Sequence, residues 1–558
     1  GVSAALRYGA VQLFVARAEA VHSGFTMNAE NADDVVETCR RLDGMALAIE
    51  LAAARVSLLG VRGVRRRLDE RLKLLATGSR TGPPRHQTLR AALQWSYGLL
   101  TLAEQTVFDR LGVFVGSFSL EAAQQVAADE AIDAWAVLDH LASLVEKSLV
   151  LVEGVETKRY RLLESSRAFA LQRLAEPGSH ETICRRHAQA IADTLTGNDP
   201  FEEPLARMRR IAPDIDNVRA ASAWAMRSSG DHQISVAIAA ATDRLWDAHG
   251  FYDEGARLYQ TIEPWLDETT PTRLAARFWF AGADLGMWTD MKRQAEAGLR
   301  AAELFRSIDD RFFIFRSLTP TALSFGHLAD RVAAERVLTE MEALLDPNWP
   351  SWTHHAIAWC KAFYEYHIER RPEEARKLVD AALRRHGSEC SYFSYACEGL
   401  LPIYDVAAGD FASALRRCDE LLGRSRVIES TSIRAYLLSR RALALVGLGN
   451  LDEAESCLRT TTTMIMQAIG PAVWLFCYIA HLLACQGRFV EAAMTLAYID
   501  NRMGSDLDRL PPVPMRCYEE TRAIIKIRLD AEALDRLHLE GFRLSADEVI
   551  AMAFPKRK

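Results

Sequence analysis

The sequence contains little lysine, and no lysine directly follows a glycine. A phosphate-binding loop of the form GxxxxGK[ST] needs that pair, because N–H groups around the glycines bind phosphate oxygens and the lysine neutralises them. An apolar strand that ends in paired acids, which would hold magnesium, is also missing from the sequence. No Ser/His/Asp, Cys/His or paired-carboxylate set can be assembled either. We therefore expect that this chain cannot hydrolyse ATP alone and is not an enzyme.

No two of the ten cysteines have the CxxC spacing that is typical of zinc sites and redox motifs. They are scattered through apolar segments that have helical periodicity, which favours reduced, buried thiols over a disulfide framework. We expect a cytoplasmic protein without a bound metal ion.

Long apolar runs are absent as well. The most apolar stretch, residues 471–485, is shorter than the roughly 20 residues that cross a bilayer, and it contains His481. It is better interpreted as a buried helix, and we expect no membrane association. The chain opens with Gly rather than Met and shows no basic, apolar leader, which suggests a fragment without a secretion signal.

The composition is that of an ordinary folded protein, with 49% hydrophobic and 25% charged residues. A chain of 558 residues is too long for a single core, so several domains or a repeat array are expected. The net charge of −7 gives no general attraction to phosphate backbones.

Helical periodicity is present along almost the whole chain, with apolar residues at i, i+3, i+4 and i+7. Thr101 with Glu104 and Ser545 with Glu548 match the capping box, and Asn31 precedes two aspartates in a predicted first turn. The fold class is therefore mainly α.

One β signal interrupts this pattern. Residues 148–164, SLVLVEGVETKRYRLLE, contain two alternating runs around Gly154 and predict a hairpin. Helices are expected before it at about 89–99, 103–111 and 133–147, and another is expected from Ser165. This order is that of a winged helix with one β-hairpin.

From about residue 250 the chain repeats a turn signature in which a small or polar residue is followed five positions later by Gly or Ala. Successive instances are 38 to 41 residues apart, and they begin at Gly250, Asp290, Ala329, Arg370, Gly409, Gly449 and Gly487. The first position suits a left-handed turn that ends one helix, and the small fifth residue lets the next helix approach closely. Such helix pairs bury their apolar faces only by stacking, which predicts an α-solenoid. The turn resembles that of the tetratricopeptide repeat, although the period is longer than the usual 34 or so residues.

The predicted domains are a helical domain at 1–85, a winged helix at 86–175, a helical bridge at 176–245, a tetratricopeptide-like solenoid at 246–510 and capping helices at 511–558.

Several segments resemble, in order and spacing, a group of bacterial transcriptional regulators. They are VQLFVARAEAV at 11, CRRLDGMALAIELAAARV at 39, LDERLKLLATGSR at 68, HQTLRAALQWSYGLLTLAEQTVFDRLGVFVGSFSLEAA at 86 and YRLLESSRAFALQRL at 160. The chain is similar here to STAND-class (NB-ARC-like) ATPases. Members of this class carry a P-loop domain, a helical domain with a GLPLA motif, a winged helix and a repeat arm. The resemblance implies that ATP or ADP binds in the full-length protein and that this chain is the part after the P-loop domain.

The resemblance also assigns candidate nucleotide-proximal residues. Gly44, Met45, Ala46 and Leu47 occupy the GLPLA position, with Ala46 in place of proline, so only the backbone there is expected to pack on an adenine. Glu164 stands near the position of a histidine-aspartate sensor in other members, and it is an interdomain contact or simply a helix-start carboxylate. No catalytic or metal-binding residue is assigned.

The third helix of the predicted winged helix is poorly suited to DNA. A recognition helix presents Arg, Lys, Asn or Gln to base edges, whereas residues 133–147 offer Asp133, Asp139, Glu146 and a single Lys147. We expect intramolecular packing by this domain and no direct DNA binding by this chain.

Two other clusters are interpreted as structural. In the basic run at 61–75, Arg66 and Arg67 are expected to pair with Asp69 and Glu70 on a solvated helix face. The cluster of Trp349, Trp352, His354 and His355 lacks the i, i+4 spacing of metal-binding histidines, and it is interpreted as loop or groove residues.

The preferred hypothesis is the regulatory and sensor portion of a STAND-class transcriptional regulator. A protein or small-molecule effector would bind in the solenoid groove, and the partner of the first domains would be the absent nucleotide-binding domain. The alternative is a free-standing repeat scaffold for protein–protein interaction, and an unrecognised enzyme ranks last. The sequence alone selects no groove residues.

Overall fold

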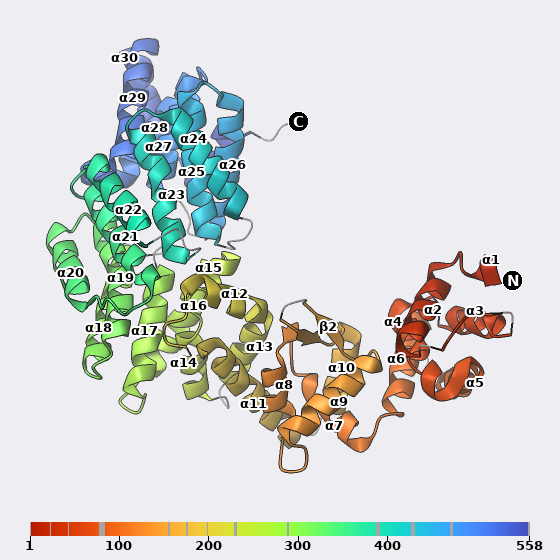
Figure 1. The fold of residues 1–558 in the computed structure, drawn as a ribbon. Helices are drawn as coiled ribbons and strands as arrows, with labels where there is room; N and C mark the ends of the chain where they lie inside the picture. Colours follow the sequence, from red (N-terminus) through yellow and green to blue (C-terminus); the bar gives the residue numbers. More distant parts are fainter. Residues whose placement is uncertain are drawn as a thin grey trace. The chain divides into compact units, whose positions relative to one another are not determined.

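The computed structural model describes the chain except residues 1, 23, 29, 43, 77–83, 155–156, 175–176, 198, 228–230, 287–289, 387–390, 426–429, 469–471 and 556–558. Within helices, the side chains at 3–4, 41, 68–76, 84–89, 177–178, 386, 425 and 467–468 also lie outside the description. The chain forms two compact units, one of Gly1–Thr194 with Pro213–Ile234 and one of Leu195–Ala212 with Ser235–Lys558. Each is drawn in Figure 1 with its elements labelled.

The first unit begins with a group of helices around a small core. They are α1 (Val2–Ala5), α2 (Gly9–Val21), α3 (Ala32–Arg41), α4 (Ala46–Ala53), α5 (Val56–Ala76) and α6 (Pro84–Tyr97). Phe14, Val35 and Ile49 are fully buried between them. Helix α5 is kinked at Gly60, and α6 packs against both α4 and α5.

The basic run on α5 is partly explained by these contacts. Arg62 and Arg65 lie 3.4 and 2.5 Å from the carboxylate of Asp34 on α3. The pairing expected for Arg66 and Arg67 involves side chains outside the described residues.

The next elements of the first unit follow the predicted order, with two additions. They are α7 (Leu102–Leu111), β1 (Ser117–Phe118), α8 (Leu120–Ala127), α9 (Ala134–Glu146), β2 (Leu151–Glu153), β3 (Arg159–Arg161) and α10 (Glu164–Arg173). The predicted hairpin is present as β2 and β3, with Val152 opposite Tyr160, and Gly154 after β2 has a positive φ. Strand β1 pairs antiparallel with β3 to give the order β1-β3-β2.

Strand β1 and helix α8 are absent from the sequence prediction. A two-residue strand is too short to show alternation. Helix α8 spans only eight residues, and its cap, Ser119, has no acidic partner three residues on. The capping box of Thr101 and Glu104 at the start of α7 is confirmed.

The segment predicted as a bridge is helical and contributes to both units. It contains α11 (Pro177–Thr196), α12 (Pro204–Ile211), η1 (Ala212–Asp214), α13 (Ile215–Ala225), α14 (His232–Ala240) and α15 (Leu245–His249). The predicted domain boundaries at 85, 175, 245 and 510 stay predictions.

The second unit contains the repeat array, a stack of helix pairs that confirms the predicted α-solenoid. After α15, the helices are α16 (Tyr252–Ile262), α17 (Thr272–Gly286), α18 (Met291–Arg306), α19 (Arg311–His327), α20 (Arg331–Leu344), α21 (Ser351–His367), α22 (Pro372–His386), α23 (Tyr392–Ala407), α24 (Phe411–Ser425), α25 (Thr431–Gly447), α26 (Leu451–Ala468), α27 (Val473–Cys485) and α28 (Phe489–Met503), with η2 (Glu263–Trp265) after α16. Each odd-numbered helix from α17 onward packs against the next even-numbered and the next odd-numbered helix. The odd-numbered helices therefore form a continuous layer, which we call the odd-numbered layer.

The turn signature has the predicted left-handed geometry at six of its seven instances, and Asp290 is the exception, with a φ of −152°. Gly250, Gly409, Gly449 and Gly487 adopt positive φ angles between 70° and 79°, and Ala329 and Arg370 adopt 54° and 59°. The small residue five positions later is buried in every repeat. At Gly255 an added Cβ would lie 2.7 Å from Cγ of Trp246, so a larger residue would separate the helices.

Helices α29 (Pro512–Arg528), α30 (Ala531–Gly541) and α31 (Ala546–Ala553) follow η3 (Gly504–Arg509), and all three contact α28. Leu537 and Val549 are buried there, and the predicted capping box of Ser545 and Glu548 is confirmed.

A buried charge network lies at the start of the repeat array. Asp243 is 2% exposed and accepts hydrogen bonds from Nε of Arg207 at 3.1 Å and from its Nη2 at 2.7 Å. Arg277 and Arg316 lie 3.7 and 3.9 Å from the same carboxylate. Arg244 pairs separately with Asp284 at 2.9 Å.

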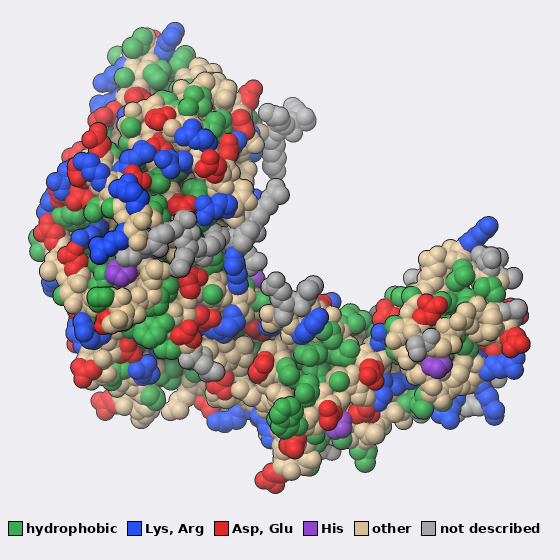
Figure 2. All heavy atoms as spheres, in the orientation of Figure 1, with side chains coloured by type: hydrophobic (Ala, Val, Ile, Leu, Met, Phe, Trp, Pro, Cys, Tyr) green, Lys and Arg blue, Asp and Glu red, His purple; other side chains and the backbone are tan. Residues whose placement is uncertain are grey.

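The nine described cysteines are free thiols, as predicted, and all but Cys485 are buried. The apolar run at 471–485 forms α27, most of which is buried. None of the helices in the described part of the chain combines the length and apolar content that a membrane span needs. On the face shown in Figure 2, acidic and basic side chains are interspersed over the repeat helices.

Candidate functional site

The GLPLA-like residues lie in the turn that enters α4. Gly44 adopts a φ of +67°, which favours glycine, and its N–H donates to the carbonyl of Cys39 at 3.1 Å. Gly44 and Ala46 are exposed, and Met45 and Leu47 are half-buried. The turn therefore leaves backbone and small side chains open to a planar group, but its role at a nucleotide stays a prediction.

Glu164 lies at the first position of α10. Its side chain is 76% exposed and pairs with Arg167, whose Nη2 lies 2.9 Å from Oε1. The hydrogen bond from Arg167 lowers the pKa of Glu164. Among the described residues, no hydrogen bond or ion pair joins Glu164 to the 44–47 turn. The arrangement is that of a helix-start carboxylate.

The charged residues at the two ends of helix α9 make contacts within the first unit. Asp133 caps the helix by accepting from the N–H of Ala136. Lys147 donates to Glu104 on α7, which also accepts from Oγ of Ser143 at 2.5 Å. Lys147, the lysine at the end of α9, is therefore already paired with Glu104 and is not free to contact a phosphate.

Of the aromatic and imidazole cluster at 349–355, Trp349 lies outside a helix. Trp352, His354 and His355 lie on α21, with Trp352 and His355 buried. The loop interpretation was wrong for these three residues, because the helix begins at Ser351, directly after Pro350. Trp352 packs at 5.7 Å on Phe393 as part of the core.

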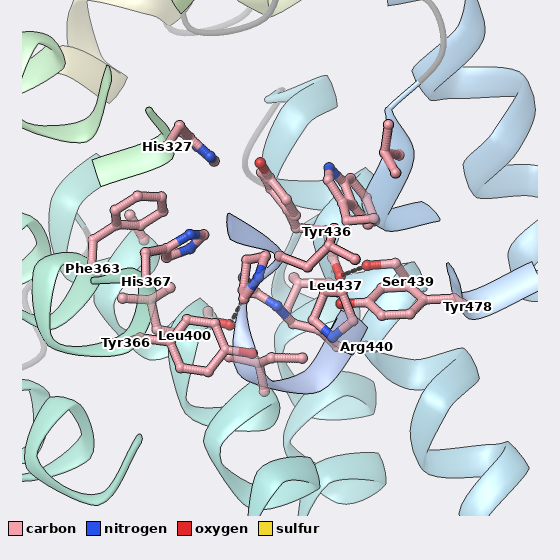
Figure 3. A pocket seen from close by; sticks show the side chains of 18 of the residues that line it. His327, Phe363, Tyr366, His367, Leu400, Tyr436, Leu437, Ser439, Arg440 and Tyr478 are labelled. Carbon is pink, nitrogen blue, oxygen red and sulfur yellow. Dashed lines mark hydrogen bonds between the residues drawn. The ribbon is translucent and has the colours of Figure 1, made fainter. Parts of the chain in front are cut away.

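A cavity of about 230 Å³ lies within the odd-numbered layer. Its lining comes from α19, α21, α23, α25 and α27 and from the segment 503–514. Figure 3 shows side chains from these elements pointing toward one another. The lining residues are His327, Trp359, Phe363, Tyr366, His367, Ala396, Gly399, Leu400, Ile403, Ile433, Tyr436, Leu437, Ser439, Arg440, Val473, Trp474, Tyr478, Met503, Arg509, Leu510, Pro511 and Pro514.

One side of the cavity is formed by rings of α19 and α21 (Figure 3). His367 stacks on Phe363 with ring centroids 3.7 Å apart, because the two residues are one helical turn apart on α21. His327 of α19 lies 4.7 Å from Phe363 and 5.1 Å from His367. Tyr366 accepts a hydrogen bond from the N–H of Val513 at 3.2 Å, which joins α21 to the start of α29.

The opposite side is formed by α25 and α27. Tyr436 stacks on Trp474 at 5.5 Å, and Trp474 contacts Tyr478 at 5.5 Å. Arg440, one turn after Tyr436, lies with its guanidinium 5.2 Å from the centre of the Tyr436 ring. It also donates to the carbonyl of Gly399 on α23.

The charged side chains that line the cavity are all basic. Burial lowers the pKa of His327 to about 4. Burial, His327 and Arg440 lower the pKa of His367 well below its usual value. Both imidazoles are therefore neutral at neutral pH, and the described lining contains no carboxylate.

Such a cavity can hold a small molecule between aromatic surfaces, with a few polar groups to orient it. Among the described residues, no group of three or more His, Cys, Asp or Glu is placed to hold a metal ion. The cavity could not be found from the sequence, because its lining comes from five helices and the segment 503–514, which are far apart in the chain. The available signal was the one-turn spacing of Phe363 with His367 and of Tyr436 with Arg440.

Comparison with known proteins identifies relatives that are named as transcriptional regulators. A Mycobacterium tuberculosis protein with the provisional name HTH-type transcriptional regulator is 32% identical over 501 residues, which cover 84% of this chain and 55% of that protein. The corresponding Mycobacterium bovis protein matches equally. The chain is homologous to these regulators. It spans about half the length of the curated relatives it matches.

A second mycobacterial protein, which is uncharacterised, is 42% identical over 184 residues, or 33% of this chain and 47% of that protein. No protein-family model matches the chain. A solved STAND protein with a tetratricopeptide-repeat sensor, from Pyrococcus horikoshii, aligns with 97% of this chain and 74% of its own. The identity is 13% and the TM-score is 0.39.

Proposed function

We propose that the chain is the regulatory and sensor portion of a STAND-class, ATP-binding transcriptional regulator. The homology to mycobacterial proteins provisionally named as regulators supports this proposal, since it extends over 84% of the chain. The order of a helical group, a small helix-and-sheet group and a repeat array is also the order in which that class places its domains after the P-loop.

The cavity in the odd-numbered layer carries the sensor part of the proposal. An effector that fills it contacts five helices, so its binding energy is shared among several repeats. If one arrangement of those repeats holds the effector better than another, the effector shifts the equilibrium between them. The repeat array would in this way control an ATPase switch elsewhere in the longer protein.

The nucleotide part of the proposal concerns the turn at Gly44. In the longer protein, this exposed turn would form the adenine side of a site whose phosphate side belongs to a P-loop domain outside the chain. ATP or ADP is then a cofactor of the longer protein and not of this chain. We propose a cytoplasmic protein in which this chain neither catalyses a reaction nor binds DNA directly.

Two measurements test the proposal. The reading frame upstream of Gly1 should encode a P-loop, whereas a native start codon near Gly1 would support a free-standing repeat scaffold. Denaturing the purified chain should release no ADP, because the phosphate-binding residues are missing. Tightly bound nucleotide in this chain alone would contradict the proposal.

A further inference from the structure

Arg440 differs from the other half-buried arginines of the repeat array in lacking an acidic partner. Its neighbour Arg441 pairs with Asp419 at 2.6 Å and with Glu453 at 2.7 Å. Arg376 and Arg417 share the carboxylate of Asp405. Arg440 donates to one backbone carbonyl and lies on the Tyr436 ring, and it forms no ion pair with an acidic side chain among the described residues.

A cation of this kind is costly to hold away from water unless an anion joins it. The second arginine of the lining, Arg509, is paired with Asp506 at 3.2 Å and is less available. The neutral imidazoles of His327 and His367 can donate hydrogen bonds but cannot supply negative charge. No side chain of the described lining supplies negative charge beside Arg440, so an anionic ligand would complement it.

The shape of the cavity limits the rest of the ligand. Its volume of about 230 Å³ is below the roughly 300 to 1,000 Å³ of sites for drug-sized molecules. Aromatic side chains lie on both sides, with His327, Phe363 and His367 facing Tyr436 and Tyr478 across the space in Figure 3. A planar, apolar body of one or two rings suits these surfaces, because rings stack in offset or edge-to-face contact.

We propose that the cavity binds a small molecule with an aromatic ring body and one carboxylate, which Arg440 holds as its counter-ion. The guanidinium can donate two parallel hydrogen bonds to a carboxylate while it remains on the Tyr436 ring. A cationic ligand would meet Arg440 without a compensating acid. This inference rests on the proposed sensor function and specifies the chemical class of its effector.

The test compares matched probes that differ in charge alone. Isothermal titration calorimetry on the purified chain would use benzoate, benzamide and benzylamine, then indole-3-acetate, indole-3-acetamide and tryptamine. At least one of the two acids should bind. Its affinity should be at least tenfold higher than that of its amide, and higher than that of its amine. Equal or tighter binding of the amide or amine, or no binding by either acid, would overturn the proposal.

Three variants assign the effect to Arg440. Arg440→Met should weaken binding of the acid at least tenfold and leave any binding of the amide unchanged. Arg440→Lys should retain more of the acid affinity, because the charge remains. Arg434→Met is the matched control, since Arg434 is exposed on the same helix and does not line the cavity. An equal loss in Arg434→Met, or no loss in Arg440→Met, would show that the cavity does not recognise the carboxylate.

These experiments measure binding to this chain and do not depend on nucleotide. Failure of the proposed function would appear instead in the upstream reading frame, or as an acid that binds without changing the nucleotide state of the longer protein. The two failures are therefore distinguishable.

Discussion

At the scale of single residues, charged side chains differ in how much they stabilise the fold, and Asp243 is expected to contribute strongly. Burial would raise the pKa of Asp243, but Arg207, Arg277 and Arg316 lower it to about 2. Arg277 and Arg316 form no other ion pair among the described residues, whereas Arg207 also lies 3.6 Å from Glu202. Arg316 is 4% exposed, and its Nη2 has no hydrogen-bond partner in the described residues.

Asp243→Asn should lower the free energy of unfolding by about 3–5 kcal/mol, because it leaves buried arginines without their anion. Urea unfolding followed by circular dichroism measures the change. Asp535→Asn is the control, since Asp535 is exposed and forms no ion pair among the described residues, and it should change stability by less than about 0.5 kcal/mol. Equal effects of the two variants would contradict this account of the network.

Glu104 gives a pH dependence to the first unit. Burial would raise its pKa, but hydrogen bonds from Lys147, Ser143 and the N–H of Thr101 lower it from 4.5 to about 2. The carboxylate therefore stabilises the folded chain above about pH 4.5, and this contribution is lost as the pH falls toward 2. Glu104→Gln should lower stability at pH 6 by about 1–3 kcal/mol and reduce the acid dependence between pH 5 and 3. Parallel stability profiles for the two proteins in urea titrations would refute this role.

At the scale of elements, the repeat depends on close helix approach at its small residue. Gly255→Ala should destabilise the chain by about 1–3 kcal/mol, because the added methyl would overlap Trp246 and Leu285. Gly423→Ala, on α24, is the matched control, because no atom lies within 4 Å of its added Cβ. That control should be neutral or more stable by up to about 1 kcal/mol, as alanine favours helices over glycine. Thermal unfolding of both variants measures whether Gly255→Ala lowers the stability while Gly423→Ala leaves it unchanged or raises it.

The left-handed turns give a second element-scale prediction. Ala329 adopts a φ of 54° where four other repeats have glycine. Ala329→Gly should therefore stabilise the chain by up to about 1 kcal/mol, and Gly409→Ala should destabilise it by about 1–2 kcal/mol, because left-handed backbone strains residues with a Cβ. Nothing lies within 4 Å of a Cβ added at Gly409, so a steric clash would not contribute to the effect of Gly409→Ala. Shifts of the same sign in chemical denaturation would exclude backbone strain as the cause.

The elements that could be predicted are those whose pattern is local. The hairpin of β2 and β3 has alternating residues around Gly154, and the repeats have a signature of six residues at a regular interval. Helix α8 and strand β1 were missed because eight and two residues give too little periodicity. The cavity could not be predicted, because the facing of Phe363 toward Tyr436 depends on how five helices stack. Trp352, His354 and His355 were interpreted as loop or groove residues because the sequence does not show that the helix begins as early as Ser351.

At the scale of the whole molecule, the chain forms two compact units. Differential scanning calorimetry should resolve more than one transition, because each unit can lose its own packing. Asp243→Asn should lower a transition of the second unit alone, and Glu104→Gln at pH 7 should lower that of the first unit alone. One transition that both variants lower together would show that the units unfold as a single body.

The cavity lining is divided among helices that each belong to a different repeat. In evolutionary terms, this lining is modular, so a substitution in one repeat alters one portion of the wall while the neighbouring repeats keep their packing. If the cavity binds the proposed effector, duplicated genes that encode this scaffold can therefore diverge in ligand preference through few, independent changes. Substitutions at lining positions such as Ala396 or Ser439 should alter ligand preference before they alter the fold.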